Sequence, residues 1–386
     1  MFFDVEKLRP TGGVKWDDKL FDEARTADVL IVLLQPATAT SDWVQREVDT
    51  ARGANVSILP IRVTQNVQIK KALEKLAISN LQFLPFDSSN PDYSAIVGSI
   101  ESLAQETRRK QKEWWENLKD SRKIKRPDSS YPKRLSFKHP EVDGVQIHIA
   151  HGDMTEMGAI DVLVNTENIY MQMARVFESD TLSSRLRYQG SLISDDADYV
   201  EEDAVQKQLD EIIEASPGLK RPVPLMSVIA TRAGHPNSRL QRKNTGGKIS
   251  GARYIFHVAS VDVSHQRDKL IPVSSDDEVR ACVTKALEKV IKVDKARGVI
   301  SPPECTSYEE EKTARRGYKP IESIIFPLFG AGRGGRSATV VIPPMVDGIW
   351  RFLRDKGDHH LKDIYLCIYS ETDVKAAEQA FLKKKF

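Results

Sequence analysis

The feature that most constrains the fold is the alternation of apolar runs with amphipathic stretches along the 386 residues. DVLIVLLQP is apolar almost throughout, as is typical of a strand buried on both faces of a sheet. SDWVQREVDTAR follows with helical spacing, and Ser41 or Asp42 is the expected N-cap. VSILPIRV then has the pattern of another buried strand. This order predicts an α/β protein with parallel strands, because parallel neighbours need a crossover helix between them.

The alternation occurs twice, which predicts two domains joined by a basic linker. Residues 1–107 carry the first and residues 143–386 the second. A helix over 94–107 is expected to close the first domain. In the connecting stretch 108–142, residues 108–134 hold eleven Lys or Arg against four Asp or Glu, which favours a solvated helix leading into a linker. Contact of these cations, with Trp114 and Trp115, to nucleic acid is the less favoured alternative.

Composition excludes several function classes. A net charge of +2 gives no case for a general nucleic-acid binder. The three cysteines lie far apart, which argues for a reducing compartment and against a disulfide framework or a zinc site. The sequence has no apolar run of membrane-spanning length and no signal peptide pattern, so no membrane partner and a cytoplasmic location are expected.

Residues 1–107 resemble a Toll/interleukin-1 receptor (TIR) domain. The matching stretches are DVEKLRPTGGVKWDDKL, ADVLIVLLQP, SDWVQRE and VSILPI, in that order. They are particularly similar to TIR domains that cleave NAD, in which the Glu that ends WVxxE is catalytic. The resemblance therefore implies Glu47 as the catalytic carboxylate, Trp43 and Ser41 at the NAD pocket, and self-association involving the loop LRPTGG. NAD would be a substrate, and no cofactor is expected.

The chemistry is compatible with these residue types. Cleavage of the nicotinamide–ribose bond develops positive charge on the sugar, and a carboxylate facing the sugar stabilises that charge. The Trp43 ring offers an apolar surface for nicotinamide or ribose. The alternatives are a solvated helix glutamate for Glu47 and ordinary packing for Trp43. TIR domains have a strand and helix before FFDV, with that strand central in the sheet, so the sequence as written predicts an incomplete flavodoxin-like parallel sheet.

Residues 143–386 resemble a macro domain, a three-layer α/β/α module with a mixed sheet that binds ADP-ribose. HGDMTEMGAIDVLVNTEN, SVIATRAG, GARYIFHVASV and IIFPLFGAGRGG carry the resemblance. It implies an adenine contact by Asp153 and a diphosphate wrapped by the glycine-rich loop. The implied ligand-binding residues are Asp153, Met154, Asn165, Asn168, Phe329, Gly330, Ala331, Gly332, Arg333 and Gly334.

These residue types fit a nucleotide, but one stretch departs from the macro hydrolases. An ionised carboxylate is a strong acceptor for an amino group, and glycines let backbone N–H groups approach phosphates. A cap residue and a plain flexible loop are the alternatives. Macro hydrolases follow their Asn-containing strand with a glycine loop, whereas NTENIYMQMARVFES has none and places Met171 and Met173 there. We therefore expect binding without hydrolysis, and we expect His257 to be a core histidine.

The two resemblances together favour a TIR–macro fusion in NAD-based signalling or antiviral defence. In this hypothesis the first half cleaves NAD to nicotinamide and an ADP-ribose species when its TIR fold is complete. The second half binds ADP-ribose or a derivative. The alternative is a non-enzymatic ADP-ribose sensor whose TIR half only mediates assembly.

Overall fold

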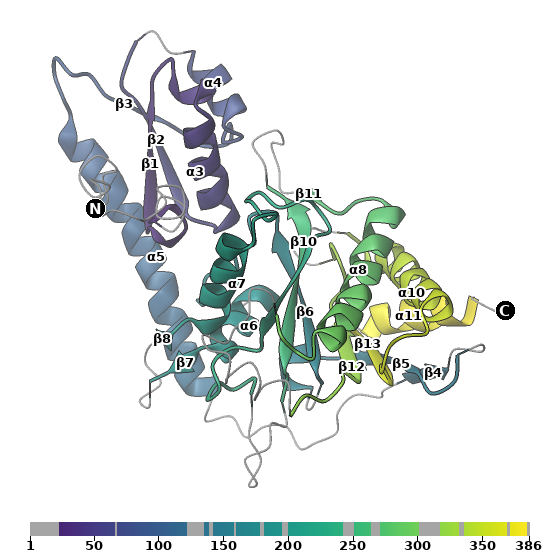
Figure 1. The fold of residues 1–386 in the computed structure, drawn as a ribbon. Coiled ribbons are helices and arrows are strands. Elements are labelled where there is room, and N and C mark those ends of the chain that lie inside the picture. Colours follow the sequence, from purple (N-terminus) through teal and green to yellow (C-terminus); the bar gives the residue numbers. More distant parts are fainter. Residues whose placement is uncertain are drawn as a thin grey trace. The chain divides into compact units, whose positions relative to one another are not determined.

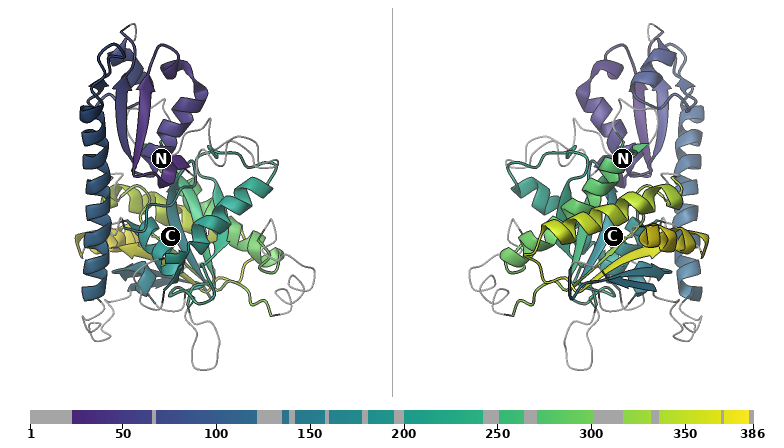
Figure 2. Two further views of the ribbon diagram at one scale, coloured as in Figure 1. Left: turned by 90° about the vertical axis from the view of Figure 1, so that its left-hand side faces the viewer. Right: turned by 90° about the vertical axis from the view of Figure 1, so that its right-hand side faces the viewer.

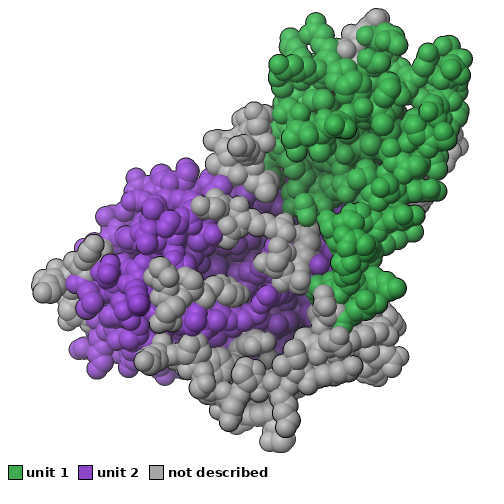
Figure 3. Space-filling view, turned by 180° about the vertical axis from the view of Figure 1, so that it is seen from behind, with its two compact units in different colours: residues 1–124, 263–271 green, residues 125–262, 272–386 purple. Residues whose placement is uncertain are grey.

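The chain forms two compact units, which are coloured separately in Figure 3. The first contains residues 1–124 and 263–271, and the second contains residues 125–262 and 272–386. This computed structural model describes residues 23–65, 68–121, 135–138, 142–157, 160–177, 181–194, 200–241, 251–263, 271–300, 317–331, 336–368 and 371–383. No helix within these ranges is both long enough and apolar enough to cross a membrane.

The described part of the first unit contains a three-stranded parallel sheet in the order β1-β2-β3 (Figure 1). Its elements are β1 (Val29–Leu34), η1 (Thr38–Thr40), α3 (Asp42–Gly53), β2 (Ser57–Arg62), α4 (Ile69–Lys75), β3 (Leu84–Pro85) and α5 (Tyr93–Ser121). Apolar side chains from β1, α3 and α4 form one core cluster, including Leu34, Val48 and Leu73. The two strands and the helix between them are therefore confirmed. Burial of the first strand on both faces is not, because Leu33 of β1 is 52% exposed. The expected strand FFDV lies outside the described residues.

The helix expected to end at residue 107 continues through the basic stretch as α5. Its cations form ion pairs one turn apart. The Arg109 guanidinium lies 2.7 Å from the Glu106 carboxylate and 2.5 Å from that of Glu113, and Lys112 lies 3.9 Å from Glu116. Such pairs support an exposed helix, so the solvated helix favoured for the start of the basic stretch is confirmed, and it is continuous with the helix predicted over 94–107.

The second unit is built on a mixed sheet in the order β11-β10-β6-β12-β13-β5-β4, with β9 also pairing with β10. The strands are β4 (Leu135–Lys138), β5 (Gln146–His151), β6 (Val162–Asn168), β9 (Val228–Arg232), β10 (Tyr254–Asp262), β11 (Ile271–Pro272), β12 (Ser323–Phe326) and β13 (Asp363–Ile368). The strands from β10 to β5 in this order are parallel, and β9 and β4 pair antiparallel with β10 and β5. The sheet is consequently mixed, as predicted.

Helices cover both faces of this sheet (Figures 1 and 2). One layer contains α6 (Leu182–Gly190) and α7 (Ala204–Ala215), and the other contains α8 (Asp276–Lys295), α10 (Ala338–Asp355) and α11 (Glu371–Lys383). The described residues of the acidic stretch 191–203 include a short antiparallel pair, β7 (Leu192–Ile193) and β8 (Val200–Glu202). Together the two units confirm the predicted α/β class.

The parallel strands bring the expected ligand-binding segments to one edge of the second sheet. The Gly152 N–H, just after β5, donates to the Ile368 carbonyl at the end of β13 at 3.0 Å. Asn168 ends β6 opposite Val261 of β10. This carboxyl edge is where open α/β sheets bind ligands.

Candidate functional site

In the first unit, the start of α3 follows β1 and η1 and carries the residues predicted to contact NAD. Ser41 is the N-cap, with φ −80° and ψ 115°, and its Oγ accepts a hydrogen bond from the Val44 N–H at 3.5 Å. The expected cap position is therefore confirmed. Trp43 lies in the first turn and is 45% exposed, which leaves much of its ring accessible.

Glu47 lies one turn beyond Trp43 and is half-buried. Residues four apart lie on the same side of a helix, so Trp43 and Glu47 share one side of α3. The Arg46 guanidinium lies 5.9 Å from the centre of the Trp43 ring, within the range of a cation–π contact. A carboxylate and an exposed aromatic ring thus lie together after β1. Their roles toward NAD stay predictions, and the loop LRPTGG lies outside the described part of the chain.

In the second unit, Asp153 follows β5 and caps the short helix η2 (Met154–Glu156). Its Oδ1 accepts from the Thr155 N–H at 2.9 Å and from the Thr155 hydroxyl at 2.8 Å, and its Oδ2 accepts from Arg185 at 2.5 Å. A carboxylate has about four acceptor positions, and bonds from the described residues occupy three of them. Asp153 is thus a cap, and its adenine contact stays a prediction. Met154 is 2% exposed as a whole residue, so it is packed inside the protein and its ligand contact stays a prediction.

Cys367 lies beneath this turn. Its thiol donates to the Gly152 carbonyl at 3.1 Å. Burial, followed by the negative charge of Asp153, raises the pKa of Cys367 to about 12. The thiol is therefore protonated near neutral pH, and Cys367 supplies no nucleophile to this edge.

The loop after β12 turns at Gly330, whose φ of +76° lies in the left-handed region. A Cβ there would lie 3.2 Å from the Cδ of Arg336, so the loop requires a glycine both for its conformation and for space. Phe329 is fully buried and packs edge-on against Phe326, with ring centroids 6.4 Å apart. The Phe329 side chain anchors the loop, which leaves backbone for ligand contact. Of the remaining predicted residues here, Ala331 is described, whereas Gly332, Arg333 and Gly334 lie outside the described residues.

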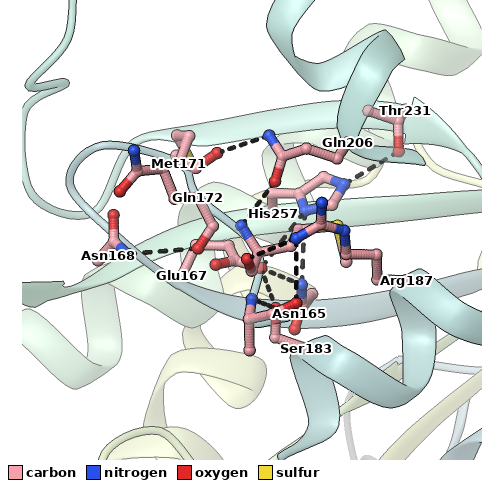
Figure 4. Close-up of polar contacts among 12 residues, drawn as sticks. Asn165, Glu167, Asn168, Met171, Gln172, Ser183, Arg187, Gln206, Thr231 and His257 are labelled. Carbon is pink, nitrogen blue, oxygen red and sulfur yellow. Dashed lines mark hydrogen bonds and ion pairs between the residues drawn. The ribbon is translucent and has the colours of Figure 1, made fainter. Parts of the chain in front are cut away.

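Asn165 belongs to a buried polar network between β6, α6 and β10 (Figure 4). The Asn165 amide donates to Glu167 Oε1 at 2.5 Å, and the Ser183 hydroxyl donates to the same oxygen at 2.7 Å. His257 is fully buried and lies 3.0 Å from the Thr231 hydroxyl through Nε2, which confirms the expected core histidine. Asn165 is also fully buried, and its Oδ1 has no hydrogen-bond partner among the described residues. A ligand contact by Asn165 stays a prediction.

The loop after β6, residues 169–175, is held by side chains from neighbouring elements (Figure 4). Gln206 of α7 accepts from the Met173 N–H at 2.7 Å and donates to the Met171 carbonyl at 3.3 Å. Ser183 of α6 accepts from the Ala174 N–H at 3.0 Å. The side chains that reach this loop therefore come from both helices that cover this face of the sheet.

Further bonds hold the same loop from its ends. Asn168 accepts from the Tyr170 N–H at 2.8 Å and donates to the Gln172 carbonyl at 3.3 Å. Arg187 donates to the Met173 carbonyl at 3.0 Å. Asn168 therefore stabilises its own loop, and contact with a ribose stays a prediction.

The loop has a defined conformation without glycine. Met171 has a φ of +52°, which costs a residue with a side chain about 1–2 kcal/mol. The side chains of Met171 and Met173 are at most 1% exposed, so both are packed inside the protein. We conclude that surrounding side chains hold the loop 169–175 in one conformation. Most of the backbone groups described here bond within the protein itself.

Sequence reasoning missed the residues that hold the loop 169–175 in place. Glu167 carried a signal, since a carboxylate within the apolar run IDVLVNTEN is rarely buried without partners. Ser183, Arg187 and Gln206 carried none, because their roles depend on where α6 and α7 pack.

Comparisons with known proteins give one result for each unit. Residues 1–98 match the family model of the TIR domain. Among solved structures, the chain is similar to the Oceanobacillus iheyensis macrodomain with ADP, at 16% identity and a TM-score of 0.41, covering 65% of this chain and 97% of that one. It is also similar to the Trypanosoma brucei macrodomain in complex with ADP-ribose, at 14% identity and a TM-score of 0.37, covering 60% and 68%. No curated protein matches the chain.

Proposed function

We propose that the first unit cleaves NAD and that the second unit binds ADP-ribose or a derivative. One half then produces the class of molecule that the other half recognises. The TIR match over residues 1–98 supports the first part. The observation that carries it is the placement of Trp43 and Glu47 on one side of α3, just after a parallel strand.

The proposed reaction breaks the C–N bond between nicotinamide and ribose. As nicotinamide leaves, positive charge develops on the ribose, and the Glu47 carboxylate stabilises that charge. Water then adds to the ribose carbon, which gives ADP-ribose, nicotinamide and a proton. The exposed Trp43 ring packs against the nicotinamide or the ribose and orients it. NAD is consumed as a substrate in this scheme.

The second unit has three features suited to a nucleotide with a diphosphate. Bonds from the described residues leave Asp153 an acceptor position for an amino group, next to its pair with Arg185. The turn at Gly330 presents backbone after a parallel strand and before α10. The loop 169–175 is already held in one conformation, and this preorganisation lowers the entropy lost on binding.

We expect this unit to bind without hydrolysis. The macro hydrolases use a glycine-rich loop where this chain has residues 169–175, whose backbone bonds largely to Gln206, Ser183 and Asn168. Cys367, the thiol near Asp153, is protonated near neutral pH. These observations support a sensor or storage role for the second unit.

Self-association through the first unit is part of the proposal. Among the described residues of this unit, Leu33, Trp43, Tyr93 and Val97 are large apolar side chains that are 45–62% exposed. Exposed apolar groups of this kind mark interaction surfaces when they gather. A soluble, cytoplasmic assembly that responds in NAD-based signalling or defence fits this surface, and nucleic acid is not an expected partner.

The same apolar side chains favour one alternative, an adaptor that assembles through the first unit and has no activity. Release of nicotinamide separates the two. The full chain is incubated with NAD across a range of protein concentrations, and nicotinamide is measured by chromatography. We expect release that rises faster than linearly with concentration. Assembly without any release would support the adaptor.

A further inference from the structure

Three polar side chains at the β4 end of the second sheet form a chain of hydrogen bonds away from the carboxyl-edge loops. The Ser136 hydroxyl lies 2.8 Å from Nδ1 of His148, and Nε2 of His148 lies 2.7 Å from Oδ1 of Asp363. Ser136 is exposed, His148 is 7% exposed and the Asp363 side chain is 39% exposed. A serine, a histidine and an aspartate are thus bonded in the order that nucleophilic catalysis uses.

The register of three strands brings these side chains together. Ser136 of β4 lies directly opposite His148 of β5 in the antiparallel pair. Tyr365 of β13 lies opposite His148 on the other side, and Asp363 precedes Tyr365 by two residues on the same face. The Tyr365 ring stacks on the imidazole, with centroids 4.6 Å apart and an interplanar angle of 23°. The imidazole is therefore fixed by a ring contact as well as by two hydrogen bonds.

One tautomer of His148 satisfies both bonds. With its proton on Nε2, the ring donates to the Asp363 carboxylate, and the lone pair on Nδ1 accepts from the Ser136 hydroxyl. The carboxylate selects this tautomer and stabilises the imidazolium that forms when Nδ1 takes a proton. Nδ1 is then placed to act as a base toward an exposed hydroxyl.

We propose that Ser136 is the nucleophile of an esterase site, with His148 as general base and Asp363 as a positioning residue. Ser136 Oγ attacks the carbonyl carbon of an ester while Nδ1 of His148 takes the hydroxyl proton. The C–O bond to the alcohol then breaks, and the alcohol leaves with that proton. Water attacks the acyl-serine in the same way and releases the carboxylic acid and free Ser136. No other reactant is needed.

The surroundings of Ser136 define the substrate class. Lys138 lies two residues along the same face of β4 and is exposed, so in the proposed site its ammonium group is the cation that stabilises the oxyanion of the tetrahedral intermediate. β4 is the last strand of the sheet in the described part of the chain, and Ser136 is open to solvent. Such a position suits a short, unhindered acyl group carried on an accessible alcohol.

The test uses the full chain with two probes, a fluorophosphonate and p-nitrophenyl acetate. We expect the fluorophosphonate adduct on Ser136 by peptide mass spectrometry. Hydrolysis of the ester should fall by about 10²–10⁴-fold in Ser136→Ala and His148→Gln, the range for loss of a nucleophile or general base. Asp363→Asn should lower kcat and leave KM unchanged. Ser94→Ala removes an exposed serine bonded to Asp92 instead of a histidine, and it should change neither readout.

Ser136 is exposed, so we expect Ser136→Ala to fold. Its hydrolysis rate therefore tests the proposal even when His148→Gln fails to fold. Lys138→Met should retain the adduct and lower the hydrolysis rate. A folded protein with no adduct on Ser136, or Ser136→Ala with the rate of the unaltered chain, would overturn the proposal.

Discussion

Glu47 and Glu167 are two glutamates in different units whose surroundings contrast. Glu47 is half-buried on a helix, one turn from an exposed tryptophan. Glu167 is 3% exposed and accepts hydrogen bonds from Asn165 and Ser183. A buried carboxylate with several donors is held in the native state and organises its surroundings, whereas a carboxylate in reach of solvent can meet a substrate. Under the proposed function, Glu47 is the carboxylate expected to meet a substrate, and Glu167 is expected to hold a binding loop in place.

The largest expected effect is on NAD cleavage by Glu47→Ala. Loss of a group that stabilises transition-state charge costs about 2–4 kcal/mol, which is about 30- to 10³-fold in rate. Glu74→Ala is the matched control, because Glu74 is an exposed helix glutamate of the same unit. Nicotinamide release is the measurement. Equal rates of nicotinamide release in Glu47→Ala and Glu74→Ala would remove Glu47 from the mechanism. They would also end the contrast between Glu47 and Glu167.

The next effect is on ADP-ribose affinity in Asp153→Ala. A hydrogen bond to a charged group contributes about 1.5–3 kcal/mol, so we expect Kd to rise by about 10–150-fold. Asp347→Ala is the control, since Asp347 also pairs with an arginine, at 2.5 Å, and is also 17% exposed. Titration calorimetry with ADP-ribose measures the Kd of both variants. Similar losses of affinity in both would mean that Asp153 acts only through stability.

A smaller effect is expected when the loop 169–175 is released by Gln206→Ala. This change leaves the Met173 N–H and the Met171 carbonyl without their partner, at a cost of about 1–3 kcal/mol. Gln208→Ala on the same helix removes a single bond from the Arg232 N–H of β9. Amide exchange should accelerate in residues 170–175 only in the Gln206 variant. Unchanged amide exchange in residues 170–175 would show that the conformation of the loop does not depend on Gln206.

The last prediction concerns the slope of stability against pH. Burial is the main reason why the pKa of Cys282 and of Cys367 is raised from 9.0 to about 12. The native state therefore keeps these protons when the unfolded state has lost them. The stabilisation is complete below pH 9 and is lost as the pH rises toward 12. We expect the free energy of unfolding to fall less steeply above about pH 9 in Cys282→Ala/Cys367→Ala than in the unaltered chain. Denaturant titrations check this, and identical slopes would contradict it.

The sequence predicted those parts of the fold whose causes are local. The apolar runs of β1, β6 and β10 and the cap at Ser41 follow from side chains within each segment. The helix in the basic stretch was also predicted, whereas its continuity with the helix over 94–107 was not, although ion pairs such as Arg109–Glu106 support one unbroken helix. The four-residue strand β4 was also missed, since it depends on pairing with β5.

The sequence predicted which segments carry the candidate ligand-binding residues, but it predicted few of the hydrogen bonds around them. Asp153 and Gly330 were found through the resemblance of GDMT and FGAGRGG to macro domains, and each lies in a turn after a strand. The partners of the loop 169–175 were not, because Gln206 lies 33 residues from Met173 and meets it only through the packing of α7. Long-range polar contacts leave no periodic pattern in a sequence.

The central claim is that the second unit binds ADP-ribose while the first consumes NAD. The most direct test is calorimetry with ADP-ribose on the full chain carrying Glu47→Ala, in which the second unit is unaltered. We expect heat of binding with one ADP-ribose per chain, and no loss of ADP-ribose from a modified protein offered as a substrate. A folded sample that gives no heat with ADP-ribose would contradict the account.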